Sequence, residues 1–171
     1  NNIDQGSVAL AVVVQELVFA EAAGILFTAN PINGKRSELV INAAWGLGEA
    51  VVSGAVTPDT LTASKLTGRM IRRDIAEKQV MTIRTESGTD EVPVPKSLKK
   101  KSVLTDAQVA ELAKLAVQIE KLYEMPMDIE WTLAAGKFAI VQARPITALP
   151  EVLEWPLPHP KAVLARGSFA E

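Results

Sequence analysis

Four polar residues near the carboxyl end of the chain have the types and spacing that phosphate chemistry needs. Asp128 and Glu130 lie at the start of "DIEWTLAAGKFAIVQARPIT", residues 128–147, and Gln142 and Arg144 follow in the same stretch. Carboxylate and amide oxygens suit magnesium, and a guanidinium can bind a phosphate oxygen. Because magnesium usually binds through one or two protein groups together with substrate phosphates, these residues could hold a magnesium-bound nucleotide.

Whether the four side chains meet depends on how this segment turns. Its pattern predicts a β-hairpin, in which Asp128 and Glu130 share one face of the first strand. One face of the second strand should carry Phe138, Ile140, Gln142 and Arg144. A three-residue loop, Ala135-Gly136-Lys137, would place Glu130 opposite Gln142 and Asp128 opposite Arg144. A two-residue loop would put the two sets on opposite faces.

The favourable register and a purely structural hairpin are both open at this point. If Glu130 faces Gln142, their Cβ atoms lie roughly 4.5 to 5.5 Å apart, so their oxygens could share one cation. Arg144 would then lie one strand step further along, within reach of a phosphate. In the structural alternative, Asp128 and Arg144 form an exposed cross-strand ion pair of little energetic weight. Spacing alone favours that alternative.

The elements that must position this hairpin are predicted from periodicity. Apolar residues at three- and four-residue steps predict a helix over 105–123, with Thr105 and Gln108 as a capping box and Pro126 preventing its continuation. The β-branched run 10–14 predicts a central strand that ends at 15–18. Further strands are expected over 24–28 and 37–44, then a β-meander over 60–84 and an exposed loop over 86–103.

The segment "WGLGEAVVSG" carries Gly46, Gly48 and Glu49 between predicted elements. A glycine lacks the Cβ that would block close approach, so this turn could contact either a phosphate or a neighbouring strand. It is not a dinucleotide fingerprint, because the third glycine and the βαβ spacing are missing.

Composition limits the class of protein. The 171 residues are 48% hydrophobic and 22% charged, which suits one globular domain or most of one. A net charge of -2 predicts no general attraction to nucleic acid or anionic lipid, and the absence of cysteine excludes disulfides and thiolate metal sites. Because neither a signal peptide nor a membrane-spanning apolar run is recognisable, a cytoplasmic protein is expected.

Five motifs in order resemble one family over about residues 12–150. The motifs are "VVVQELV", "GILFTANPINGKR", "VINAAWGLGEAVVSGAVTPD", "DIEWT" and "VQARPIT". Together they resemble the ATP-binding domain of the pyruvate phosphate dikinase and phosphoenolpyruvate synthase family. The resemblance implies an α+β fold, the carboxyl-terminal part of an ATP-grasp domain, with a mostly antiparallel sheet and packed helices. It assigns residues 1–150 to that domain and 151–171 to an interdomain linker and the start of the next domain.

The resemblance also implies roles for individual residues, with ATP and Mg²⁺ as ligands. Glu130 and Gln142 match magnesium and phosphate residues, Asp128 is their acidic neighbour, and Arg144 matches the arginine on the transferring phosphates. Glu49 matches a further position near the nucleotide. The hinge that receives adenine corresponds to Gln15, Glu16, Leu17 and Val18.

Parts of the family's machinery are not recognisable in this sequence. The amino-terminal ATP-grasp subdomain, with its phosphate-binding lysine, is expected as a partner from the same parent chain, as is a swivelling domain that carries a phosphohistidine. His159, the single histidine, lies in the proline-rich "EWPLPHPKAVL" without the context of a carrier histidine, and is not expected to be catalytic. The fragment alone is therefore expected to be inactive.

The acceptor of the phosphoryl group is left between alternatives. The tail "LARGSFAE", residues 164–171, resembles the entry to the drug-binding domain of rifamycin phosphotransferases, so a rifamycin acceptor is slightly preferred. Phosphoenolpyruvate synthase, with pyruvate as acceptor, is the alternative, and pyruvate phosphate dikinase itself fits the motifs less well. A non-catalytic nucleotide-binding module is the alternative from another functional class.

Overall fold

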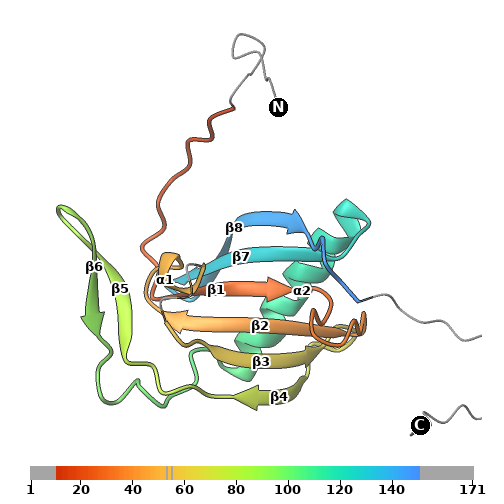
Figure 1. Ribbon diagram of the computed structural model, residues 1–171, viewed down its shortest axis with the longest axis horizontal. Helices are drawn as coiled ribbons and strands as arrows, with labels where there is room; N and C mark the ends of the chain where they lie inside the picture. The colour runs from red at the N-terminus through yellow and green to blue at the C-terminus, as the bar shows by residue number, and fades with distance from the viewer. Residues whose placement is uncertain (1–10, 53, 55, 151–171) are drawn as a thin grey trace, which may run out of the picture.

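A six-stranded antiparallel sheet with a long helix on one face forms the centre of the computed structural model, which describes residues 11–52, 54 and 56–150 (Figure 1). Strand order across the sheet is β4-β3-β2-β1-β7-β8, and a separate two-stranded sheet contains β5 and β6. The elements are β1 (Ala22–Phe27), β2 (Glu38–Trp45), α1 (Glu49–Val52), β3 (Asp59–Ser64), β4 (Met70–Asp74), β5 (Val80–Thr85), β6 (Gly88–Pro93), α2 (Asp106–Tyr123), β7 (Met127–Ala134) and β8 (Lys137–Pro145). The predicted α+β class with a mostly antiparallel sheet is confirmed.

Alternation along the strands separates a core face of the sheet from an open face. On the core face, side chains such as Leu26, Ile41 and Ile129 pack against Val109 and Leu112 of α2. The side chains between them in sequence point to the opposite face, because strand residues alternate. This open face carries Glu130 and the residues paired with it.

The helix prediction over 105–123 is confirmed by α2. Thr105 Oγ1 accepts a hydrogen bond from Gln108 N at 3.3 Å, and Gln108 Oε1 accepts one from Thr105 N at 2.9 Å, which completes the capping box. The helix ends at Glu124, which adopts the left-handed conformation two residues before Pro126. Because Pro126 cannot continue the helix, the chain passes directly into β7.

The predicted meander over 60–84 is wrong in part. β3 and β4 pair in the main sheet around Gly68, which has a φ of +68°, but β5 leaves that sheet and pairs with β6. Residues 86–103 were expected to be an exposed loop, whereas β6 occupies 88–93 and Val94 is buried. Glu86 and Ser87 form the hairpin turn between β5 and β6, and the charged and polar residues around this turn are also typical of an exposed loop.

The strand expected at 10–14 is not formed in the described part of that range. Residues 11–20 have no regular secondary structure, and Val12, Val13 and Val14 are 83%, 82% and 93% exposed. In Figure 1 this segment runs away from the sheet. A β-branched run becomes a strand only when a neighbouring strand supplies hydrogen bonds, and no described residue pairs with it.

Two other expectations fall outside the described residues. The linker and next domain assigned to 151–171, and His159 within them, lie beyond residue 150.

Among the described helices, none combines the length and apolar character that a bilayer crossing requires.

Candidate functional site

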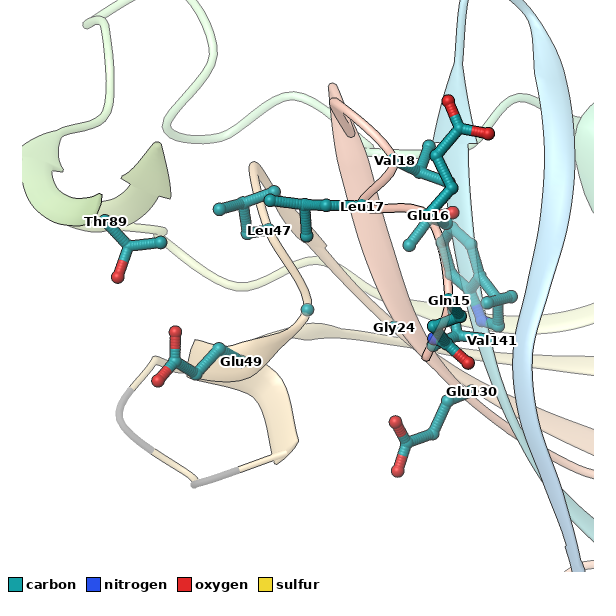
Figure 2. Close-up of a pocket in the computed structure, with 13 residues that line it drawn as sticks. Gln15, Glu16, Leu17, Val18, Gly24, Leu47, Glu49, Thr89, Glu130 and Val141 are labelled. Atoms are coloured by element: carbon teal, nitrogen blue, oxygen red, sulfur yellow. The ribbon is translucent and has the colours of Figure 1, made fainter. Parts of the chain in front are cut away.

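A pocket of about 430 Å³ lies where the amino-terminal segment, the glycine-rich turn and the β7–β8 hairpin meet. Figure 2 shows the carboxylates of Glu49 and Glu130 extending toward the same open side, while that of Glu16 points away from them. The lining residues are Gln15, Glu16, Leu17, Val18, Gly24, Leu47, Gly48, Glu49, Thr89, Glu130, Trp131, Thr132 and Val141. The pocket therefore combines apolar walls with three carboxylates that the sequence had singled out, those of Glu16, Glu49 and Glu130.

The β7–β8 hairpin pairs Glu130 with Gln142 by a route that the sequence did not predict. Its loop is Ala135-Gly136, with φ angles of +48° and +74°, so of the two loops considered the two-residue one is formed, which by itself would have put the two sets on opposite faces. The register shifts between Glu130 and Trp131, and Val141 is the extra residue of this β-bulge. Glu130 consequently faces Gln142, as the favourable register required.

The bulge also changes which residues of β8 share a face. Before it, Ile140 pairs with Trp131 and Phe138 with Leu133, so both belong to the core face of the sheet. Phe138 packs edge-on against Trp131, with ring centroids 5.6 Å apart. The expectation that Phe138 and Ile140 share a face with Gln142 and Arg144 is therefore wrong, because Val141 resets the alternation.

Asp128 and Arg144 form a cross-strand ion pair beside this position. Nε and Nη2 of Arg144 each lie 2.9 Å from Oδ2 of Asp128. Hydrogen bonding to Asp128, followed by the charges of Asp128 and Glu130, raises the pKa of Arg144 above its ordinary value. The guanidinium stays charged, and its side chain is 56% exposed on the open face of the sheet.

The donor set at Glu130 and Gln142 fits a magnesium ion that also binds phosphate oxygens. No group of three or more His, Cys, Asp or Glu side chains in the described part of the chain could hold a metal ion. A cation bound here would complete its coordination with ligand and water oxygens, which is the usual magnesium arrangement. Glu130 and Gln142 would hold it, since both present hard oxygens from directly opposed positions.

Two neighbours of Glu130 along β7 support a polar ligand on this face. Asp128 Oδ1 and Thr132 Oγ1 are buried and have no hydrogen-bond partner among the described residues. Buried polar atoms in folded proteins are paired in the large majority of cases. The open face beside Glu130 is therefore suited to a ligand with polar groups.

The glycine-rich turn contacts a neighbouring strand, one of the two roles that its sequence left open. Leu47 N donates to Thr82 O at 2.9 Å, and Gly46 forms a parallel bridge with Thr82 of β5. A Cβ on Gly46 would lie 2.2 Å from Thr82 O, and its φ is +83°, so only glycine fits without rearrangement. The turn thereby brings the β5–β6 hairpin, with Thr89, to the pocket.

The structure brings together most of the predicted nucleotide residues, but not all of them. Gln15, Glu16, Leu17, Val18, Glu49 and Glu130 line the pocket. Asp128, Gln142 and Arg144 lie on the adjoining open face of β7 and β8 without lining it. Arg84 lies over the Phe19 ring at 4.5 Å, which connects the segment after Val18 to β5.

Sequence reasoning missed several pocket residues. Thr89 was missed because β6 was read as a loop, and Val141 because the bulge was not foreseen. Thr132 and Leu47 belong to motifs that the sequence analysis used, but neither side chain is charged, so neither was proposed as a ligand residue. The alternation of "DIEWT" does place Thr132 on the face of Glu130, which is the signal that could have found it.

Comparisons with known proteins found a matching family model and several similar curated proteins. The family model described as pyruvate phosphate dikinase, AMP/ATP-binding domain, matches residues 1–156. A probable phosphoenolpyruvate synthase of Methanocaldococcus jannaschii is 53% identical over 147 residues, which is 85% of this chain and 12% of that protein. A probable phosphoenolpyruvate synthase of Methanothermobacter thermautotrophicus is 42% identical over 167 residues, 98% of this chain and 24% of that protein.

A second name occurs among the relatives. A rifampicin phosphotransferase of Streptomyces sviceus is 45% identical over 150 residues, 87% of this chain and 17% of that protein. The chain thus spans a quarter or less of the length of these three curated relatives, from 12% to 24%.

Proposed function

Because the chain belongs to the family of pyruvate phosphate dikinase AMP/ATP-binding domains, we propose that its pocket and the adjoining open face bind Mg-ATP. The supporting observation is the register of the β7–β8 hairpin, which sets Glu130 against Gln142 and Asp128 against Arg144. We further propose that this part of the chain is the carboxyl-terminal part of an ATP-grasp domain.

In this proposal each group does a separate task in phosphoryl transfer. Glu130 and Gln142 hold Mg²⁺, which supplies charge neutralisation on the phosphate oxygens when it is bound. Arg144, held by Asp128, presents its guanidinium to the phosphates. Residues Gln15–Val18 and the apolar pocket wall receive the nucleoside. Catalysis then rests on positioning and electrostatic stabilisation, the main contributions in reactions of this class.

For the whole protein we propose an AMP-forming dikinase that phosphorylates a carrier histidine and then an acceptor. Pyruvate is supported by the phosphoenolpyruvate synthase relatives, one of them 53% identical. A rifamycin is supported by the 45% identical rifampicin phosphotransferase and by the sequence of 164–171. The two candidates are distinguished by offering each acceptor separately and identifying the phosphorylated product.

The proposal is tested with Glu130→Gln in the full-length protein that contains this chain. The substitution keeps the shape of the side chain but removes the negative charge that would bind magnesium. We expect magnesium-dependent AMP formation to fall by about a hundredfold or more, a loss typical of removing a preorganised electrostatic group. Circular dichroism and thermal unfolding should match those of the unmutated protein.

Glu111→Gln is the matched control, since Glu111 is exposed on α2 away from the pocket. It should leave AMP formation unchanged. An undiminished rate in the Glu130 variant would contradict the assignment of Glu130. If the unmutated protein binds ATP tightly but forms no AMP with any acceptor, the non-catalytic nucleotide-binding module is supported instead. We expect the 171-residue chain by itself to form no AMP.

A further inference from the structure

Thr132 lines the pocket and carries a buried hydroxyl that bonds no residue in the described part of the chain. The residue is 9% exposed, and Oγ1 has no hydrogen bond to any described residue. Valine would fill nearly the same space at lower cost, because an unpaired buried hydroxyl loses its hydration without compensation. A threonine at this position therefore calls for a partner that none of the described residues provides.

The side chain of Thr132 lies on the open face of the sheet. Thr132 pairs with Ala23 of β1 and shares its face with Glu130, while Trp131 between them faces α2. The glycine-rich turn covers the same place, since a Cβ on Gly48 would lie 3.4 Å from Ala23 Cβ. The side chain of Thr132 is thus on the side of the sheet that the turn carrying Glu49 covers.

The position of Thr132 along β7 identifies the part of the ligand it can reach. Along β7, Asp128 and Glu130 are paired with the polar residues Arg144 and Gln142 of β8. Thr132, further along the strand, is paired with Ala139, which has no polar side chain. The pocket that Thr132 lines has apolar side chains in its wall, among them Leu17, Leu47 and Val141. A triphosphate fits the charged end of this row, and a nucleoside fits the apolar end.

We propose that Thr132 Oγ1 hydrogen-bonds a polar group of the nucleoside and so acts as a specificity residue. The inference rests on the proposed binding of Mg-ATP. A hydroxyl can both donate and accept, so the partner is either the base edge or a ribose hydroxyl. The bond is made only when the nucleotide is present, which explains why Oγ1 has no partner among the described residues.

Thr132→Val in the full-length protein separates this role from a structural one. Without ligand, the variant should be as stable as the unmutated protein or more stable, because an unpaired polar group is removed. Its affinity for Mg-ATP should fall about three- to tenfold, the range of one neutral hydrogen bond. Thr132→Ser retains the hydroxyl and should keep most of the affinity. Calorimetric titration and thermal unfolding measure the two effects.

Magnesium tripolyphosphate, which has no nucleoside, separates this inference from the proposed function. Its affinity should be unaffected by Thr132→Val but reduced by Glu130→Gln. Thr62→Val is the control, because Thr62 lies on the same face in β3 opposite Val40. If Glu130→Gln weakens Mg-ATP binding while Thr132→Val does not, Thr132 has no such role. Absence of any ATP binding by the unmutated protein would overturn both proposals.

Titrations with two ATP analogues identify the bonded group. Purine riboside triphosphate lacks the exocyclic amino group, and 2′-deoxy-ATP lacks one ribose hydroxyl. The analogue that lacks the group bonded by Thr132 should bind the unmutated protein and Thr132→Val with equal affinity. ATP should bind the unmutated protein more tightly than the variant. Equal affinity of the two proteins for ATP and for both analogues would refute the hydrogen bond.

Discussion

Arg144 illustrates how a structural ion pair can orient the group that a proposed function would use. Two of its nitrogens lie 2.9 Å from a single oxygen of Asp128, and the other Asp128 oxygen is buried without a partner in the part of the chain that the structure describes. The remaining guanidinium N–H groups point from an exposed side chain, so they are available to a ligand. The ion pair that spacing alone favoured as a structural feature is present, and it orients the group that phosphate binding would use.

Arg144→Lys should lower AMP formation by the full-length protein about tenfold or more. A lysine ammonium is a point charge and cannot both bond Asp128 in this planar geometry and bind a phosphate oxygen with its fork. Steady-state rates at saturating ATP measure the effect. Arg72→Lys is the matched control, because Arg72 forms an exposed ion pair with Asp74 on β4. A rate for Arg144→Lys within twofold of the control would argue against the role of the guanidinium.

At the scale of elements, the two glycines of the Gly-Leu-Gly turn differ in what they do. Gly46 has a φ of +83° and lies against Thr82 of β5, while Gly48 is in ordinary contact with Ala23. Only the first is required by backbone conformation and close approach. The turn therefore connects the main sheet to the β5–β6 hairpin, and Gly48 and Glu49 extend from this connection into the pocket.

Gly46→Ala should destabilise the protein by about 2 kcal/mol or more. Alanine is strained in the left-handed backbone conformation, and its Cβ would displace Thr82. The hairpin should move away from the turn, which weakens Mg-ATP binding as well. Gly48→Ala should change the free energy of unfolding by less than about 0.5 kcal/mol. Urea denaturation and ATP titration of both variants check this, and equal losses of stability in the two would show that the Thr82 contact is not what matters.

At the scale of the molecule, one buried ion pair connects segments that are distant in sequence. The side chains of Lys78 and Asp59 are 1% and 0% exposed and lie 2.5 Å apart. Asp59 also accepts hydrogen bonds from Ala76 N at 3.0 Å and Val103 N at 2.9 Å. The carboxylate thus joins the start of β3, the segment leading to β5, and the segment leading to α2.

Lys78→Met should cost about 3–5 kcal/mol in free energy of unfolding, because it leaves the Asp59 carboxylate buried without its cation. Chemical denaturation at neutral pH measures this. Lys100→Met is the matched control: Lys100 pairs with Glu77 at the surface, where the two side chains are 77% and 50% exposed. Surface pairs contribute little, so no measurable change is expected there. A small effect of Lys78→Met would mean that water replaces the ammonium group.

Local signals were sufficient for much of this protein. The capping box and three- and four-residue periodicity of α2 depend on residues near in sequence, and so do the turns at Gly34 and Gly68, both of which have positive φ. The mainly apolar stretches that form β1 and β2 were equally readable as strands. By contrast, the run at 12–14 carries the same β-branched signal without forming a strand, because pairing requires a partner that periodicity cannot supply.

The sequence by itself determined the chemical groups of the site: two carboxylates, an amide and a guanidinium in one hairpin, and a glycine-rich turn beside Glu49. Only the tertiary structure decided that the four hairpin groups pair across the strands, because Val141 bulges out of β8 and restores a register that the two-residue loop alone would have lost. It also decided that Gly46 packs on Thr82 and that Thr132 faces the pocket. Such contacts depend on how separate strands pair, and strand pairing is set by the packing of the whole sheet rather than by neighbouring residues.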